Sequence, residues 1–196
     1  MATGAFARPL SERSERRESA RFCPHGITPV IPFKRAQIPA NNDQRPTTAS
    51  DELWMEEALR AAQRALQAGE VPIGAVVVCE GQIIGRGWNR NIGDNDPTAH
   101  AEIVALRQAA ATVGNHRLPE CDLFATIEPC PMCAGAMVHA RIKRLVYGAD
   151  DPKAGAVHSA MQVLNHEQLN HRVEVRSGIL AGRCAELLQT FFKSRR

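Results

Sequence analysis

Two short motifs constrain this chain more than any other feature: His100-Ala101-Glu102 and Pro129-Cys130-Pro131-Met132-Cys133. One imidazole and two thiolates form a ligand set that favours zinc over other divalent metals. Structural zinc sites fill all four coordination positions with protein ligands, whereas catalytic sites supply three and leave the fourth to water. Three ligands beside a non-ligand carboxylate, Glu102, therefore predict an enzyme that activates water. The fold must bring the two motifs together.

The second motif has the sequence of a helix start. Cys130 and Cys133 are three residues apart, so on a helix their sulfurs lie on one face. The flanking prolines suit a first helical turn, where the backbone N–H groups lack intrahelical partners. The positive end of the helix dipole stabilises the thiolates that bind metal. By itself, a Cys-x-x-Cys pair is about as typical of a redox motif as of zinc.

The first motif decides in favour of the metal, on a geometric condition. Residues two apart on a helix point about 200° away from each other. His100 and Glu102 therefore converge only if His100 lies at the start of its helix. Zinc on His100, Cys130 and Cys133 would lower the pKa of a water molecule, and Glu102 would move the protons. Glu128 is a weaker candidate for chemistry, because a carboxylate beside a proline can simply hold the loop.

Elsewhere the chain alternates between helical and strand patterns, which predicts an α/β sandwich. A helix capped by Ser50 should end at Gly69, and a β-branched run should form a hairpin with the next strand. The expected elements, in order, are the helix 50–69, strands 71–80 and 82–88, helix 98–112, strand 122–127, helix 130–140, strand 143–148, a short helix and loop within 155–171, strand 173–175 and helix 179–193.

Charge divides the chain into two parts. Residues 1–50 hold eight Lys and Arg against four acidic residues, so the net charge of +3 comes from this segment and residues 51–196 carry a formal −1. The segment lacks periodicity, and we expect a disordered or poorly ordered extension before a zinc-dependent domain at 51–196. A domain with this charge is not predicted to bind nucleic acid on electrostatic grounds alone.

The sequence also bears on location. No apolar run approaches the roughly 20 residues that a membrane helix needs, so no membrane span is expected. Of the six cysteines, two belong to the metal motif, and Cys79, Cys121 and Cys184 lie in apolar patterns typical of buried thiols. Without a secretory signal pattern, a reducing cytoplasm is the expected compartment.

Residues from about 50 to 196 resemble the bacterial tRNA-specific adenosine deaminases, within the cytidine/deoxycytidylate deaminase superfamily. The zinc motifs match the H-x-E…P-C-x-x-C signature, which occurs throughout that superfamily. The flanking blocks point to the tRNA-specific group. They are Val71-Pro72-Ile73-Gly74-Ala75, Gly87-Trp88-Asn89-Arg90, Asp96-Pro97-Thr98-Ala99-His100-Ala101-Glu102, Glu128-Pro129-Cys130, Cys133-Ala134-Gly135-Ala136-Met137, Tyr147-Gly148-Ala149, Leu169-Asn170-His171-Arg172-Val173 and Phe191-Phe192.

The resemblance implies a three-layer α/β/α sandwich with a mixed sheet of about five strands, as in cytidine deaminases. It implies a homodimer with one zinc ion per subunit that deaminates adenosine to inosine at the wobble position of a tRNA anticodon stem-loop. His100, Cys130 and Cys133 would be the ligands and Glu102 the proton shuttle. The implied substrate-binding residues are Asn89, which would hold the flipped nucleoside, Asp151 and Lys153 at the RNA-binding edge, and Arg195 and Arg196 in the C-terminal tail.

Other interpretations stay open at this stage. Asn89 and Asp151 can be ordinary turn residues. The same zinc chemistry can act on a free base or nucleoside such as guanine or cytosine. A non-catalytic, zinc-stabilised RNA-binding module is a third possibility, but a structural zinc site has no need of the carboxylate of Glu102.

Overall fold

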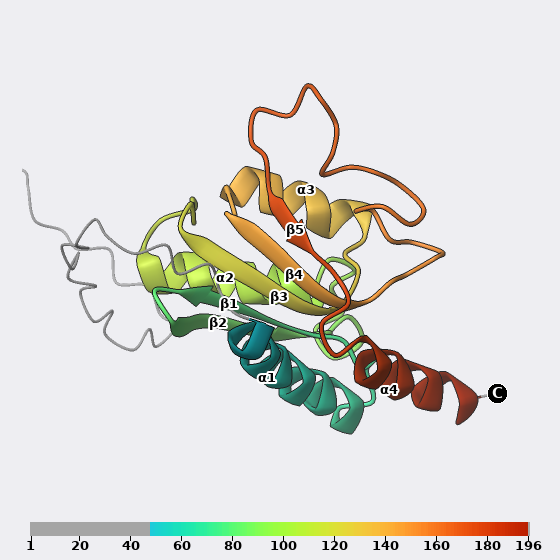
Figure 1. Cartoon of the computed structure of the whole chain (residues 1–196). Coiled ribbons are helices and arrows are strands. Elements are labelled where there is room, and N and C mark those ends of the chain that lie inside the picture. Colours follow the sequence, from blue (N-terminus) through green and yellow to red (C-terminus); the bar gives the residue numbers. More distant parts are fainter. Residues whose placement is uncertain (1–47, 196) are drawn as a thin grey trace, which may run out of the picture. The chain divides into compact units, whose positions relative to one another are not determined.

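The computed structural model describes residues 48–195, which contain four helices and five strands (Figure 1). In chain order these are α1 (Thr48–Gln67), β1 (Gly74–Cys79), β2 (Gln82–Trp88), α2 (Ala101–Val113), β3 (Cys121–Ile127), α3 (Pro131–Ala140), β4 (Arg144–Ala149), β5 (Glu174–Arg176) and α4 (Ala181–Lys193). The strands form one sheet in the order β2-β1-β3-β4-β5. The β1 pairings are antiparallel, whereas β3, β4 and β5 run parallel. The expected mixed five-stranded α/β sandwich is confirmed.

Alternating residues of the central strands build two separate cores. On one face, Val77, Leu123 and Leu145 pack with residues of α2 and α3. On the other face, Val76 and Phe124 pack with residues of α1 and α4. Because successive side chains of a strand point to opposite faces, a strand buried on both sides reads as a continuous apolar run. Figure 1 shows α1 and α4 together on one side of the sheet, away from α3.

A glycine lets α2 approach the sheet closely. A Cβ atom added to Gly87 in β2 would lie 2.0 Å from the carbonyl oxygen of Ala101 and 2.5 Å from the nitrogen of Ala105. No side chain fits at such a distance, so the first turns of α2 rest directly on the strand backbone. This contact fixes the start of α2, directly after His100.

A buried ion network joins α1 to the sheet. Arg144 in β4 donates to both carboxylate oxygens of Asp51, at 3.0 and 2.9 Å, and to Asp122 in β3, at 3.1 and 2.7 Å. Arg176 in β5 also donates to Asp51, at 2.7 Å. Asp51 is fully buried and is balanced by these two cations. The network therefore fixes the first turn of α1 against three strands.

Several expected boundaries differ. Helix α1 begins at Thr48, so Ser50 lies inside the helix instead of capping it. Residues 1–47 of the expected extension lie outside the described residues. Helix α2 begins at Ala101 and not at residue 98, because Asp96 accepts hydrogen bonds from the backbone and hydroxyl of Thr98 and holds a turn there.

The short helix expected within residues 155–171 does not form; that part of the described chain consists of turns and bends. The reason is a competing acceptor: the backbone N–H groups of Val157, His158 and Ser159 all donate to the carboxylate of Glu128. They are thus withdrawn from helical hydrogen bonding. Among the described helices, none is both long and apolar enough to cross a bilayer.

Candidate active site

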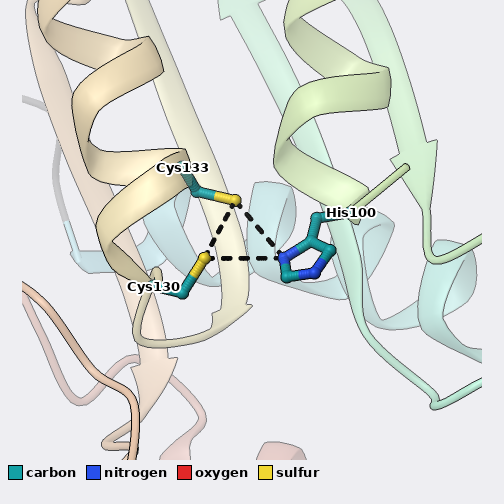
Figure 2. A group of neighbouring side chains, drawn as sticks. All are labelled: His100, Cys130 and Cys133. Atoms are coloured by element: carbon teal, nitrogen blue, oxygen red, sulfur yellow. Dashed lines mark hydrogen bonds between the residues drawn. The ribbon is translucent and has the colours of Figure 1, made fainter. Parts of the chain in front are cut away.

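His100, Cys130 and Cys133 converge on one point between α2 and α3 (Figure 2). The two sulfurs lie 3.6 Å apart, and each lies 3.6 Å from Nδ1 of His100. A tetrahedral zinc ion with bonds of about 2.3 Å to sulfur and 2.0–2.1 Å to nitrogen requires separations of about 3.8 Å between sulfurs and about 3.6 Å between sulfur and nitrogen. The cluster therefore has the ligand types and the spacing to hold such a metal ion.

The starts of two helices place these side chains. His100 is the N-cap of α2, with φ −70° and ψ 152°, and Cys130 is the N-cap of α3, with φ −71° and ψ 170°. Both residues therefore have an extended backbone and lie directly ahead of the helix that follows. This satisfies the geometric condition on His100 and Glu102, because His100 precedes the helix. Both positive helix ends also point toward the thiolates.

Asn89, the residue after β2, supports the start of α2. Its Oδ1 accepts a hydrogen bond of 2.9 Å from the backbone N–H of Ala101, the first residue of the helix. His100 itself makes no side-chain capping bond. Asn89 therefore takes over the role of a cap from twelve residues upstream and leaves the imidazole available to a metal. Its side chain is 5% exposed.

Glu102 lies beside the metal cluster, in the first turn of α2, and is 2% exposed. Burial raises the pKa of its carboxyl group, and the nearby Cys130 thiolate adds to the shift, while His100 and a hydrogen bond with Cys133 oppose it. The carboxyl group therefore ionises less readily than an exposed one and can exchange protons nearer neutral pH. This is the property that a proton shuttle requires.

The two thiols differ in acidity. Their mutual hydrogen bond lowers the pKa of Cys130 to about 4, in spite of burial and with further help from His100. The same contact, together with burial, raises the pKa of Cys133. The hydrogen bond to Cys130 also raises the pKa of His100. One thiolate is thus already stabilised, and a bound cation would stabilise the second.

Glu128 organises the loop beside the site. Its Oε1 accepts bonds from the N–H groups of Val157, His158 and Ser159 at 3.0, 2.9 and 3.0 Å, and its Oε2 accepts from Asp151 N–H at 3.1 Å and from the Ser159 hydroxyl. Burial opposes ionisation, but these donors hold the pKa of Glu128 at about 2. Its position beside Pro129 suggested a loop-holding role, but its partners lie more than twenty residues away.

Sequence reasoning missed Glu70, which holds the loop after Asn89. Its Oε1 accepts bonds from Ile92 N–H at 2.9 Å and Gly93 N–H at 2.7 Å, and the residue is 3% exposed. The only signal in the sequence was an acidic residue directly after the predicted helix end at Gly69. No motif connects it with the loop.

The contacts of the remaining predicted substrate-binding residues are with groups outside the metal cluster. The Asp151 carboxylate accepts bonds from the N–H groups of Lys153 and Ala154, so it stabilises a turn, and Lys153 is exposed. Arg195 donates to the Gly69 carbonyl at 2.8 Å and stacks 4.2 Å from the centre of the Phe191 ring. Arg196 lies outside the described residues. Phe191 is buried.

Comparison with known proteins connects this geometry to a family. Residues 49–196 match the MafB19-like deaminase family. A tRNA-specific adenosine deaminase of Haemophilus influenzae is 51% identical over 147 residues, covering 74% of this chain and 85% of that protein. A tRNA-specific adenosine deaminase of Bacillus subtilis is 44% identical over 146 residues, covering 74% of this chain and 91% of that protein.

Solved structures agree with the sequence relatives. A structure from studies of A-to-I editing by tRNA:A34 deaminases at the wobble position of transfer RNA shares 48% identity and a TM-score of 0.68, covering 69% of this chain and 99% of that one. A guanine deaminase from Nitrosomonas europaea shares 25% identity and a TM-score of 0.61, covering 71% and 83%. The chain is therefore a deaminase and belongs to the tRNA-specific adenosine deaminase family.

Proposed function

We propose that this protein hydrolyses adenosine to inosine, with release of ammonia, at the wobble position of a tRNA anticodon. The observation that carries the proposal is a buried carboxylate, Glu102, beside a His-Cys-Cys cluster that could hold a metal ion. Three such protein ligands would leave one coordination position to a water molecule. The relatives at 44–51% identity are tRNA-specific adenosine deaminases, which supports tRNA adenosine as the substrate.

Glu102 carries the proton transfers in this mechanism. A zinc ion on His100, Cys130 and Cys133 would supply the Lewis acidity that lowers the pKa of a water molecule. Glu102 accepts one proton from the water and delivers it to the purine ring nitrogen as the water oxygen bonds to the carbon that bears the amine. It then carries the second proton of that oxygen to the amine, and the C–N bond breaks to release ammonia. Its raised pKa favours both directions, since a carboxyl group that titrates nearer neutral pH can serve as base and then as acid.

The side chains proposed to contact the substrate differ in exposure and in the hydrogen bonds that they already make. Asn89 has committed its Oδ1 to Ala101, so its Nδ2 group would donate to the flipped nucleoside. Lys153 is exposed and would meet a phosphate, with Asp151 shaping the turn that carries it. Arg195, with Arg196 beyond it, would contact the anticodon loop near Phe192, which is 50% exposed and can stack on a base.

We further propose zinc as the metal, at one ion per subunit, in a cytoplasmic homodimer. Two thiolates and an imidazole favour zinc among divalent metals, and a reducing cytoplasm keeps the thiols available. Metal analysis of the purified protein should give one zinc ion per chain. Light scattering during size-exclusion chromatography should give twice the chain mass.

The decisive experiment offers the purified protein two kinds of substrate. One is an anticodon stem-loop with adenosine at the wobble position, and the others are free adenine, adenosine, guanine and cytosine. Inosine should appear in the stem-loop, and the free compounds should remain unchanged. Guanine is the critical competitor because a guanine deaminase shares the fold at 25% identity. Turnover of guanine without turnover of the stem-loop would refute the proposal.

Glu102→Gln is the matched control, since the amide preserves size and removes the proton carrier. It should keep the metal and the fold while reducing kcat by about 10²–10⁴-fold, the usual contribution of a general acid–base group. If the variant retained wild-type kcat, the role given to Glu102 would be wrong.

A further inference from the structure

The Glu128 carboxylate accepts five hydrogen bonds, more than any other side chain described above makes, yet the reaction gives it no chemical task. It lies between the end of β3 and Cys130, and it is 2% exposed. The hydrogen-bond donors to its carboxylate all belong to residues 151–159, called here the 151–159 segment. One carboxylate thus joins the loop that carries a metal ligand to the loop that carries Asp151 and Lys153.

The contact is shaped on both sides. Within the 151–159 segment, Gly155 lies so close to Glu128 that an added Cβ would be 2.2 Å from Oε2 and 2.6 Å from the Asp151 carbonyl oxygen. The backbone adds a further bond, from Ala156 N–H to the Pro129 carbonyl at 2.8 Å. The segment therefore fits closely around the carboxylate, and its backbone N–H groups donate to the Glu128 carboxylate and to the Pro129 carbonyl.

We propose that Glu128 is the positioning residue that fixes the 151–159 segment beside the metal-ligand helix and thereby sets the affinity for the RNA substrate. Glu128 itself contacts neither the metal cluster nor the base; it acts through Asp151 and the turn leading to Lys153. The inference rests on the proposed function, in which this segment meets the RNA. A loop held in its binding conformation loses less entropy when the ligand binds.

Glu128→Gln tests the idea sharply, because the two oxygens have different partners. An amide oxygen in place of Oε1 can still accept from residues 157–159. Its NH2 group then faces the Asp151 N–H, where donor meets donor and no bond forms. The opposite orientation would lose three bonds and is less favourable. The variant should therefore release the Asp151 end of the segment and keep the other end.

Two measurements read out this release. Hydrogen exchange of the Asp151 amide should accelerate at least tenfold in Glu128→Gln, with α3 amides unchanged. With the adenosine stem-loop, KM should rise about tenfold while kcat stays within twofold. A merely structural role would lower the active fraction, and so kcat, at constant KM. Glu120→Gln, which removes an exposed carboxylate paired with Lys143, is the control and should change neither quantity.

Gly155→Ala provides a second, independent variant, since its Cβ would push the segment off the carboxylate. It should raise KM in the same way, and the double variant Glu128→Gln/Gly155→Ala should raise KM by less than the product of the two single effects. Unchanged KM in both variants, a loss of kcat at constant KM, or faster exchange throughout the domain would overturn the proposal. If wild type leaves the stem-loop unmodified, the proposed function fails, whereas the exchange experiment still decides whether Glu128 holds the segment.

Discussion

Replacing Arg144 by Met tests the buried ion network that joins α1 to the sheet. The guanidinium makes four hydrogen bonds to Asp51 and Asp122 and lies 5.6 Å from the centre of the Phe124 ring. Its side chain is 10% exposed, and that of Asp51 is 0%. Met preserves much of the aliphatic stem but removes every donor, so the substitution leaves Asp51 buried with Arg176 as its remaining partner in the network.

The size of the effect follows from that imbalance. Removing one partner of a buried ion pair costs about 3–5 kcal/mol, because the other charge stays in a poorly solvated place. Arg176 still donates to Asp51, and Asp122 is 21% exposed and can regain water, so we expect the lower end, about 3 kcal/mol. That is a large part of the roughly 5–15 kcal/mol that stabilises a typical domain.

Urea unfolding followed by circular dichroism measures this loss as a change in the free energy of unfolding. Arg183→Met is the control, because Arg183 pairs with Glu56 at the surface, where such pairs contribute about 0–1 kcal/mol. The double variant Asp51→Leu/Arg144→Met removes both charges and should be more stable than the sum of the single effects predicts. If Arg144→Met lost no more stability than Arg183→Met, the reasoning would be refuted.

Three further predictions concern packing, metal and pH. Gly87→Ala should lower stability by about 1–3 kcal/mol or more in urea unfolding, because its Cβ would overlap the Ala101 carbonyl and displace the start of α2; an unchanged midpoint would contradict the close contact. Removing the metal with a chelator should abolish deamination and lower Tm, and zinc should restore both. Hydrogen bonds from Thr98 and Arg107 lower the pKa of Asp96, so its contribution to stability should be present above its unfolded pKa of about 4 and be lost as the pH falls below that value. Asp96→Asn should flatten this part of the stability–pH curve, and an unaltered curve would argue against the predicted shift.

Much of the fold could be predicted from local patterns. The strand over Gln82–Trp88 has the predicted bounds, and the other strands differ by a few residues. These segments are readable because period and residue type act over short distances, and turns at glycine end them. The three candidate ligands were also identifiable, since imidazole and thiolate side chains in that spacing have few other uses.

The hydrogen-bond and ion-pair partners of charged side chains could not be predicted where those partners are distant in the sequence. Asp51 looked like an ordinary acid in the first turn of a helix, and its partner Arg144 lies 93 residues away. Glu128 looked like a loop residue, and nothing local connects it to residues 157–159. An ion pair or a backbone bond of this kind leaves no periodic trace, because it depends on which segments the sheet brings together.

The sequence by itself determined the chemistry of this protein: which atoms can hold a metal, which carboxylate stands beside them, and which elements surround them. The tertiary structure decided how that chemistry is presented. The start of α2 depends on the turn at Asp96 and on the bond from Ala101 to Asn89, and these place His100 ahead of the helix so that it converges with the cysteines. The physical reason is that residue types fix what a group can bind, whereas direction and burial are fixed only when distant backbone donors and acceptors meet in the folded chain.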